Sequence, residues 1–153
     1  MEKGTIEGVA NYTRVEPTIG CAGAVKPDAM PAIKAQGFAS VVNLRMANEP
    51  GAEVEASRAA AEKAGLRYIH LPFDGSSPDP AVVEKFLAAV KEPANQPMFI
   101  HCASANRVGA VWLIKRVKQD GWPVERALEE ATAIGLTNPA LKKFALDYVG
   151  AAG

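Results

Sequence analysis

The chain has few of the residue types that most often cross-link a protein or bind a metal ion. Its 153 residues include two cysteines and two histidines. Two cysteines cannot form the disulfide framework of a small secreted domain, and these side chains lack the spacing of a zinc site. The sequence also contains neither a GxGxxG nor a GxxxxGK motif, so it lacks the standard glycine-rich loops for nucleotides. We therefore expect no metal and no cofactor.

The chain also lacks an excess of charge of either sign and a long hydrophobic run. Basic and acidic residues both number 17, so the net charge is zero. This balance gives no general attraction to nucleic acid or to an anionic membrane, and we expect neither partner. No stretch has the length of a transmembrane helix, and residues 1–5 lack the apolar segment of a signal peptide. These features predict a cytoplasmic protein, or a periplasmic one if a signal peptide has been removed.

Short strand-like segments alternate with amphipathic segments along the chain, without internal repeats or a linker. The length predicts a single domain over residues 1–153, with its core at about residues 12–148. Strands are predicted at residues 12–16, 19–23, 38–44, 66–73 and 98–102. Helices are predicted at residues 27–36, 52–64, 80–90, 107–119, 124–134 and 138–148. This βαβ spacing predicts an α/β fold with a mostly parallel central sheet flanked by helices on both faces.

The most informative segment is residues 98–110, MFIHCASANRVGA. Hydrophobic residues lead into His101 and Cys102, a short loop follows, and Arg107 opens a hydrophobic helical stretch. The order predicts a strand, a tight loop and a helix, which places the sulfur of Cys102 at a helix N-terminus. Backbone N–H groups and the helix dipole favour a thiolate there. The guanidinium of Arg107 adds a cation whose planar fork fits an oxyanion.

Cys102 is therefore the candidate nucleophile, and Arg107 is the candidate group for binding the substrate oxyanion. The loop between them supplies the candidate substrate-binding residues, which are Ala103, Ser104, Ala105 and Asn106. Their backbone N–H groups are the main expected contribution, with side-chain hydrogen bonds from Ser104 and Asn106. The alternative interpretation of Cys102 is a buried core thiol, which is the interpretation that we favour for Cys21.

Residues 101–107 resemble the signature of the cysteine-dependent phosphatases of the tyrosine and dual-specificity type. Two other segments agree: residues 41–45, VVNLR, are similar to the strand before the first crossover helix of that family. Residues 68–74, YIHLPFD, resemble the strand and loop that carry its general acid. The resemblance covers about residues 12–148 and is closest to small bacterial phosphatase-like proteins. It implies a phosphorylated protein or small molecule as substrate and a cysteinyl-phosphate intermediate.

Asp74 is the candidate general acid, because it follows a predicted strand and precedes a glycine-containing loop that could close over the site. Asp79 is the competing carboxylate, but its place before Pro80 fits a helix N-cap. The resemblance implies that His101 helps to orient the loop. Arg45, like Asp74 and Cys102, follows a predicted parallel strand, so we expect the three side chains to meet at one sheet edge.

The loop departs from the pattern of that family at three positions. Four residues separate Cys102 from Arg107 where the family has five, Ala105 stands at a glycine position, and Val108 replaces a serine or threonine. Rhodanese-like sulfurtransferases also have a four-residue loop, so sulfur transfer through a Cys102 persulfide is an alternative. A side chain at a position that requires positive φ would strain the loop, so a non-catalytic phosphate-binding module is another alternative. The sequence does not indicate the oligomeric state.

Overall fold

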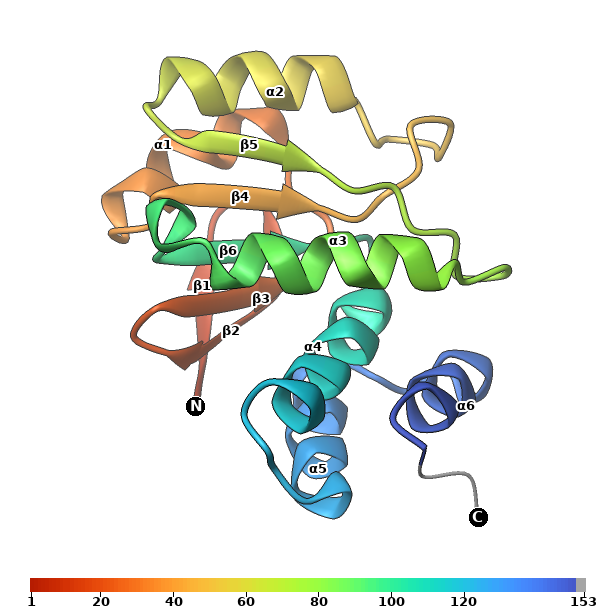
Figure 1. Cartoon of the computed structure of the whole chain (residues 1–153). Coiled ribbons are helices and arrows are strands. Elements are labelled where there is room, and N and C mark those ends of the chain that lie inside the picture. Colours follow the sequence, from red (N-terminus) through yellow and green to blue (C-terminus); the bar gives the residue numbers. More distant parts are fainter. Residues whose placement is uncertain (151–153) are drawn as a thin grey trace.

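The computed structural model describes residues 1–150 as an α/β fold built on one six-stranded sheet (Figure 1). The strands are β1 (Glu2–Ile6), β2 (Val9–Glu16), β3 (Ile19–Ala22), β4 (Ser40–Asn43), β5 (Arg67–His70) and β6 (Met98–His101). The helices are η1 (Pro27–Ala29), α1 (Met30–Ala35), α2 (Val54–Lys63), α3 (Pro80–Lys91), η2 (Pro93–Asn95), α4 (Asn106–Lys118), α5 (Val124–Ile134) and α6 (Pro139–Tyr148). The fold class predicted from the sequence is confirmed, and β1 is an additional strand.

The parallel part of the sheet brings four strand ends to one edge. The strand order is β1-β2-β3-β6-β4-β5. The first three strands form an antiparallel meander, whereas β3, β6, β4 and β5 run parallel. Ala22, His101, Asn43 and His70 lie side by side in this parallel register. The four strands therefore end level, and the connections that follow them meet where the sites of such sheets form.

Helices cover both faces of the sheet because successive residues of a buried strand point to opposite sides. Val41 and Phe99 pack in one hydrophobic cluster with residues of α1 and α2. Val42 and Ile100 pack in a second cluster with residues of α3, α4, α5 and α6. Figure 1 shows this division, with α2 on one side of the sheet and α4 to α6 on the other. The predicted helices on both faces are confirmed.

The helix α4 lies at the centre of the second layer. Eight of its residues are buried, among them Val108 and Trp112. It contacts α3, α5 and α6, as expected for a helix that is hydrophobic nearly all round. Because α4 begins directly after the loop that follows β6, this packing fixes the position of its N-terminus at the sheet edge.

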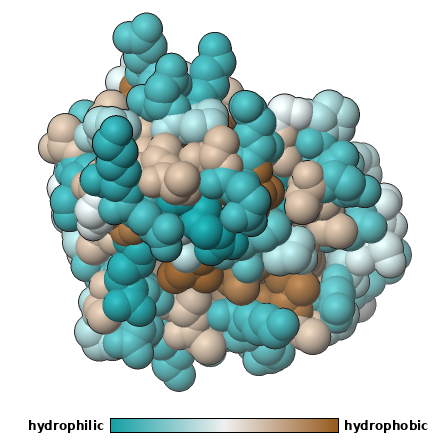
Figure 2. Space-filling view, turned by 90° about the horizontal axis from the view of Figure 1, so that it is seen from above, coloured by the Kyte–Doolittle hydropathy of each residue, from teal (hydrophilic) through white to brown (hydrophobic). Residues whose placement is uncertain are grey.

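The face of the molecule on the side of α2 is largely hydrophilic. Figure 2 views the face on the side of α2 and shows small, separate hydrophobic areas among polar side chains. Within residues 1–150, none of the helices combines the length and the hydrophobicity that a membrane span requires.

Candidate active site

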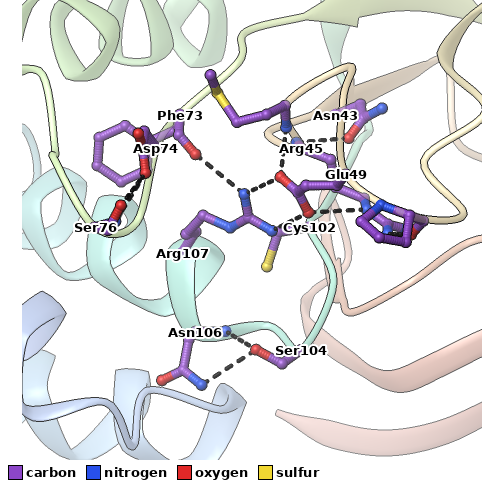
Figure 3. A network of polar contacts seen from close by, with 12 residues as sticks. Asn43, Arg45, Glu49, Phe73, Asp74, Ser76, Cys102, Ser104, Asn106 and Arg107 are labelled. Atoms are coloured by element: carbon purple, nitrogen blue, oxygen red, sulfur yellow. Dashed lines mark hydrogen bonds and ion pairs between the residues drawn. The ribbon is translucent and has the colours of Figure 1, made fainter.

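Three connections that leave the carboxyl ends of parallel strands form the candidate site (Figure 3). Arg45 and Glu49 lie in the connection after β4, Asp74 lies in the connection after β5, and Cys102 directly follows β6. Arg107 reaches the same place from the first turn of α4. The structure thus brings together the three strand-end residues expected from the sequence, and it adds Glu49 between Arg45 and Arg107.

Cys102 lies beneath the N-terminus of α4. It is buried, and its Sγ atom accepts a hydrogen bond of 3.2 Å from the backbone N–H of Ala105. Ala105 is the N-cap of α4 and has a φ of 75° and a ψ of 1°. This is the left-handed conformation that the sequence predicted at the glycine position of the loop. The N–H group of Ala105 and the N-terminus of α4 thus both lie at the sulfur of Cys102.

Cys21 lies near Cys102 but is not bonded to it. Both thiols are free and buried. Cys21 pairs in register with Ile100, two residues before Cys102, so the two cysteines are diagonal neighbours on the same sheet face. Diagonal neighbours are about 7–8 Å apart, beyond the usual reach of a disulfide. Burial raises the pKa of the Cys21 thiol, which agrees with the predicted inert core position.

The polar side chains of the loop hold the loop itself. Ser104 Oγ accepts hydrogen bonds from Asn106 through its backbone N–H at 3.4 Å and its side-chain Nδ2 at 3.2 Å. Asn106 Oδ1 accepts from the backbone N–H groups of Thr137 and Asn138 at 2.7 and 2.8 Å. Asn11, which the sequence analysis did not single out, donates to the carbonyl oxygen of Ser104 at 3.5 Å. The loop is therefore fastened to β2 and to the α5–α6 connection.

Arg107 is bound on one edge by Glu49. Its Nη1 lies 2.6 Å from Glu49 Oε2, and its Nη2 lies 2.9 Å from Glu49 Oε1. Nη1 also donates to the carbonyl oxygen of Phe73 at 3.1 Å. The hydrogen bond from Arg107 lowers the pKa of Glu49 to about 2, and the same bond raises the pKa of Arg107. Glu49 thus supplies the compensating negative charge that Arg107 requires at the start of a helix.

Arg45 anchors the connection that carries Glu49. Its Nε donates to Glu49 Oε1 at 3.3 Å. Its Nη2 donates to the carbonyl oxygen of Pro50 at 2.8 Å. His70, to which the sequence analysis assigned no role, donates from Nε2 to the carbonyl oxygen of Arg45 at 2.6 Å. These bonds help to fix the connection that carries Glu49.

Asp74 lies in a loop that packs on Arg107, but its carboxylate is bonded to Ser76 (Figure 3). Asp74 Oδ1 accepts hydrogen bonds from the hydroxyl of Ser76 at 2.7 Å and from its backbone N–H at 2.9 Å. These bonds lower the pKa of Asp74. A β-carbon on Gly75 would lie 3.7 Å from the side-chain carbons of Arg107, so this loop covers the stem of that side chain.

Asp79, the other carboxylate considered, has a structural place. It is the N-cap of α3, and its Oδ1 accepts from the backbone N–H of Ala81 at 2.9 Å. Pro80 follows as the first residue of the helix. The predicted N-cap is confirmed, and Asp74 is left as the carboxylate of this connection that lies near Arg107.

His101 lies in β6 and is buried. Its Nδ1 lies 3.2 Å from the carbonyl oxygen of Cys102. Burial is the main cause that lowers the pKa of His101 to about 4, so the ring is neutral near pH 7. A neutral ring that donates from Nδ1 would fix the peptide that begins the loop. Within the described part of the chain, Nε2 has no hydrogen-bond partner.

The described residues do not offer a metal site. Across residues 1–150, no three histidine, cysteine, aspartate or glutamate side chains are grouped closely enough to hold one ion. The charged groups of the candidate site are instead two guanidinium groups and carboxylates, with one thiol. Such a set can bind an oxyanion and supply a nucleophile and a proton donor.

Comparison with known sequences identifies related proteins. The family model described as "Beta-lactamase hydrolase-like protein, phosphatase-like domain" matches residues 11–119. The Beta-lactamase hydrolase-like protein of Xylella fastidiosa (strain Temecula1) is 31% identical over 86 residues, which cover 54% of this chain and 19% of that protein. The protein of the same name from Agrobacterium fabrum is 30% identical over 105 residues, which cover 66% of this chain and 24% of that protein. The chain thus spans about a fifth to a quarter of these relatives.

Solved structures share the fold over almost the whole chain. A candidate phosphatase (DUF442) of Shewanella putrefaciens CN-32 superposes with a TM-score of 0.81 at 22% identity, covering 95% of both chains. TpbA of P. aeruginosa in complex with pTyr gives 0.72 at 22% identity, covering 99% of this chain and 90% of TpbA. The core catalytic domain of the PP-IP phosphatase SIW14 of S. cerevisiae superposes with a TM-score of 0.77 at 18% identity, covering 94% of this chain and 88% of that domain.

Proposed function

We propose that this chain, which belongs to the phosphatase-like domain family of the Beta-lactamase hydrolase-like proteins, is a cysteine-dependent phosphatase acting on phosphate monoesters. The observation that carries the proposal is the joint position of Cys102 and Arg107 at the N-terminus of α4. There the thiol accepts the N–H of Ala105 at 3.2 Å beside a cation. We also propose that residues 1–153 form one such domain, with its core at about residues 12–148.

The substrate class follows from the anion-binding groups. Backbone N–H groups at a helix N-terminus and an arginine fork suit a phosphoryl group. Two relatives of the same fold support this class, since TpbA was solved with pTyr and SIW14 is named a PP-IP phosphatase. We propose a phosphorylated protein or small molecule as the substrate of this chain.

The first chemical step transfers the phosphoryl group to sulfur. The Cys102 thiolate attacks phosphorus and forms an S–P bond while the ester O–P bond breaks. Protonated Asp74 gives its proton to the departing oxygen, so the alcohol or phenol leaves neutral. Arg107 and the backbone N–H groups of Ala103, Ser104, Ala105 and Asn106 bind the three non-bridging oxygens.

The second step returns the enzyme to its starting state. Water attacks phosphorus and gives a proton to the Asp74 carboxylate while the S–P bond breaks. Inorganic phosphate leaves, and the N–H of Ala105 stabilises the regenerated thiolate. In both steps Asp74 must exchange its bonds to Ser76 for a bond to the reacting oxygen. A turn of the Asp74 side chain, or a movement of residues 74–79, supplies that exchange.

A paired assay on one preparation tests the proposal. One arm measures hydrolysis of p-nitrophenyl phosphate, and the other measures sulfur transfer from thiosulfate to cyanide. We expect phosphate release by the wild-type chain and by Cys21→Ala, the matched control, and none by Cys102→Ser. Release that persists in Cys102→Ser would overturn the scheme. Sulfur transfer that depends on Cys102, without phosphate release, would favour the sulfurtransferase alternative. If the chain shows neither activity but still binds phosphate, the result would favour the non-catalytic phosphate-binding module.

A further inference from the structure

We propose that Asn11 is a positioning residue for the nucleophile loop, residues 102–107. Its side-chain amide holds the peptide between Ser104 and Ala105 so that the N–H of that peptide faces Cys102. This inference rests on the proposed function, in which the same N–H binds the thiolate and a phosphoryl oxygen. Asn11 lies in β2, 93 residues before Ser104 in the chain.

One peptide group connects Asn11 to the sulfur of Cys102. Its carbonyl oxygen, on Ser104, accepts a hydrogen bond from Asn11 Nδ2 at 3.5 Å. Its N–H, on Ala105, donates to Cys102 Sγ at 3.2 Å. In a planar trans peptide the carbonyl and the N–H point in opposite directions. A donor that binds the carbonyl oxygen from outside the loop therefore keeps the N–H pointing inward, at the sulfur.

The conformation of Ala105 shows why this peptide needs support. Its φ of 75° and ψ of 1° are those of the third residue of a type II turn, where glycine is preferred. A half-turn of the peptide would give the φ of about −90° of a type I turn, which most residues adopt without strain. The same half-turn would point the carbonyl oxygen of Ser104 at Cys102 and take the N–H away. The methyl group of Ala105 thus favours the peptide orientation that repels an anion.

The amide of Asn11 is fixed in the orientation that this role requires. Its Oδ1 accepts a hydrogen bond from Lys3 Nζ at 2.9 Å. A lysine ammonium can only donate, so Oδ1 faces Lys3 and Nδ2 faces the other way. Nδ2 donates to the carbonyl oxygen of Ile134 at 3.1 Å and to that of Ser104. The two N–H groups of the amide are therefore both used, one on α5 and one on the nucleophile loop.

A β-bulge aims Asn11 at these two carbonyl groups. Between the pairs Gly4–Tyr12 and Ile6–Val9, one residue of β1 opposes two residues of β2, and Asn11 is one of the two. Its φ of 50° is a left-handed value that asparagine adopts more readily than most residues. Bulges redirect a side chain, and this one turns Asn11 toward α5 and the nucleophile loop.

Gly135 leaves the space in which the amide meets the loop. A β-carbon on Gly135 would lie 3.0 Å from Asn11 Nδ2 and 3.3 Å from the carbonyl oxygen of Ser104. Within residues 1–150, Asn11 Nδ2 is the one hydrogen-bond donor to that carbonyl oxygen. The orientation of the peptide between Ser104 and Ala105 therefore depends on a single side chain outside the loop.

The rival interpretation is that Asn11 only caps the end of α5. The carbonyl group of Ile134, the last residue of α5, is one of the four that a helix leaves unbonded at its C-terminus. A residue with that role alone would support the stability of the fold. The effect of removing it would then not depend on which residue stands at position 105. The two interpretations therefore differ in how a substitution of Asn11 combines with Ala105→Gly.

The test compares the affinity for inorganic phosphate, measured by calorimetry without turnover. Asn11→Gly removes the amide and keeps the bulge, because glycine adopts positive φ without strain. We expect this change to weaken phosphate binding about fivefold or more, since the left-handed region disfavours an alanine by a factor of about 5–30. Lys3→Ala is the matched control. It removes the exposed partner of Asn11 Oδ1, leaves Nδ2 in place and should bind phosphate like the wild type.

Ala105→Gly supplies the rescue. In that background Asn11→Gly should cost little phosphate affinity, because glycine at position 105 has no preference for the turned peptide. NMR spectroscopy of the ¹⁵N-labelled chain adds a direct signature of the peptide. The amide proton of Ala105 should move upfield in Asn11→Gly, as expected when its hydrogen bond to sulfur is lost. It should stay in place in Lys3→Ala.

Equal losses of phosphate affinity with alanine and with glycine at position 105 would overturn the proposal. So would wild-type affinity, or an unmoved amide proton of Ala105, in Asn11→Gly. If Asn11→Gly does not fold, Asn11→Asp takes its place, because it keeps the shape of the side chain but has no N–H. Its negative charge repels phosphate equally in both backgrounds. Equal losses would again overturn the proposal, and a smaller loss with glycine at position 105 would support it.

This proposal and the proposed function can fail separately. If the wild-type chain hydrolyses no phosphate ester, but its phosphate affinity depends on Asn11 while alanine stands at position 105, the phosphatase proposal fails and the positioning role stands. If hydrolysis depends on Cys102 but Asn11→Gly binds and hydrolyses like the wild type, only the positioning role fails. If the chain binds no phosphate, the amide proton of Ala105 decides the positioning role alone.

Discussion

The methyl group of Ala105 lies so close to Gly135 that a β-carbon added to Gly135 would come within 2.8 Å of it. Ala105 belongs to the loop that holds Cys102, and Gly135 ends α5. Both residues have positive φ, 75° and 149° respectively. The loop beside the nucleophile is therefore packed directly on the end of α5, and its shape depends on a glycine 30 residues away.

We expect Gly135→Ala to destabilise the fold by about 2 kcal/mol or more, because steric overlap adds to the cost of an alanine at positive φ. Urea denaturation of the wild type and the variant measures this difference. Gly37→Ala is the matched control, since Gly37 has a φ of 97° but no atom lies within 4 Å of an added β-carbon. Combining Gly135→Ala with Ala105→Gly should cost less than the sum of the single changes. Equal losses in Gly135→Ala and Gly37→Ala would contradict the contact.

The bonds from Ser76 to Asp74 predict a pH effect on catalysis. They lower the pKa of Asp74, so the protonated form that serves as general acid is lost at a lower pH. Ser76→Ala removes the hydroxyl bond of 2.7 Å, and the pKa of Asp74 should then rise. The alkaline limb of the pH profile of kcat/KM should move to higher pH.

Two variants make this measurement specific. Ser77→Ala is the control, because only its backbone N–H bonds to Asp74. Asp74→Asn should slow turnover by about 10²–10⁴-fold and remove the alkaline limb. If the limb stays at the same pH in Ser76→Ala, Asp74 is not the group that titrates there.

Asn106 connects the candidate site to the α5–α6 connection, and two substitutions separate its roles. Asn106→Ala leaves the N–H groups of Thr137 and Asn138 without their acceptor and should cost about 1–2 kcal/mol. Asn106→Asp keeps that acceptor and places a negative charge at a helix N-terminus, so stability should be kept. The same charge repels a phosphate ester, and KM should rise roughly tenfold. Thermal unfolding measures the stability of each variant, and KM for p-nitrophenyl phosphate measures the repulsion. An Asn106→Asp variant that loses stability, or that keeps the KM of the wild type, would refute the separation of the two roles.

Local patterns in the sequence predicted most of the fold. The helix cap at Asp79 and the all-round hydrophobicity of α4 are properties of neighbouring residues, and the structure agrees with each. The strand β1 was not predicted, because four of its five residues are exposed at the sheet edge and show no alternating pattern. Residues 27–36 form η1 and then α1 instead of one helix, since Pro31 has no N–H to continue the bonding.

The candidate site was predicted less completely than the fold. The positions of Arg45, Asp74 and Cys102 follow from the strand ends, which is a rule of parallel sheets. The bond between Glu49 and Arg107 joins residues far apart in sequence, and no local pattern signals it. The bond between Asp74 and Ser76 had a local signal, because an aspartate commonly accepts hydrogen bonds from the residue two positions on.

The stability of the fold should depend on the ionisation of Glu49. Its pKa in the folded chain is about 2, lower than its ordinary value of 4.5, so folding favours the ionised carboxylate. A group with a lowered pKa stabilises the fold above its ordinary pKa and loses that contribution as pH falls toward the folded value. The contribution should be on the order of 3 kcal/mol near neutral pH. It should disappear progressively as pH falls from about 4.5 toward about 2.

Urea denaturation between about pH 7 and about pH 3 checks this expectation with the wild type, Glu49→Gln and Glu55→Gln. The wild type should be more stable than Glu49→Gln at neutral pH, and the difference should shrink below about pH 4.5 because the glutamine does not titrate. Glu55→Gln should follow the wild type, since Glu55 is 85% exposed. If the stability difference between the wild type and Glu49→Gln stays constant over this pH range, the folded chain does not favour the ionised form of the Glu49 carboxylate. In that case Arg107 would be held by its bond to the carbonyl oxygen of Phe73 and by packing, and not by the charge of Glu49.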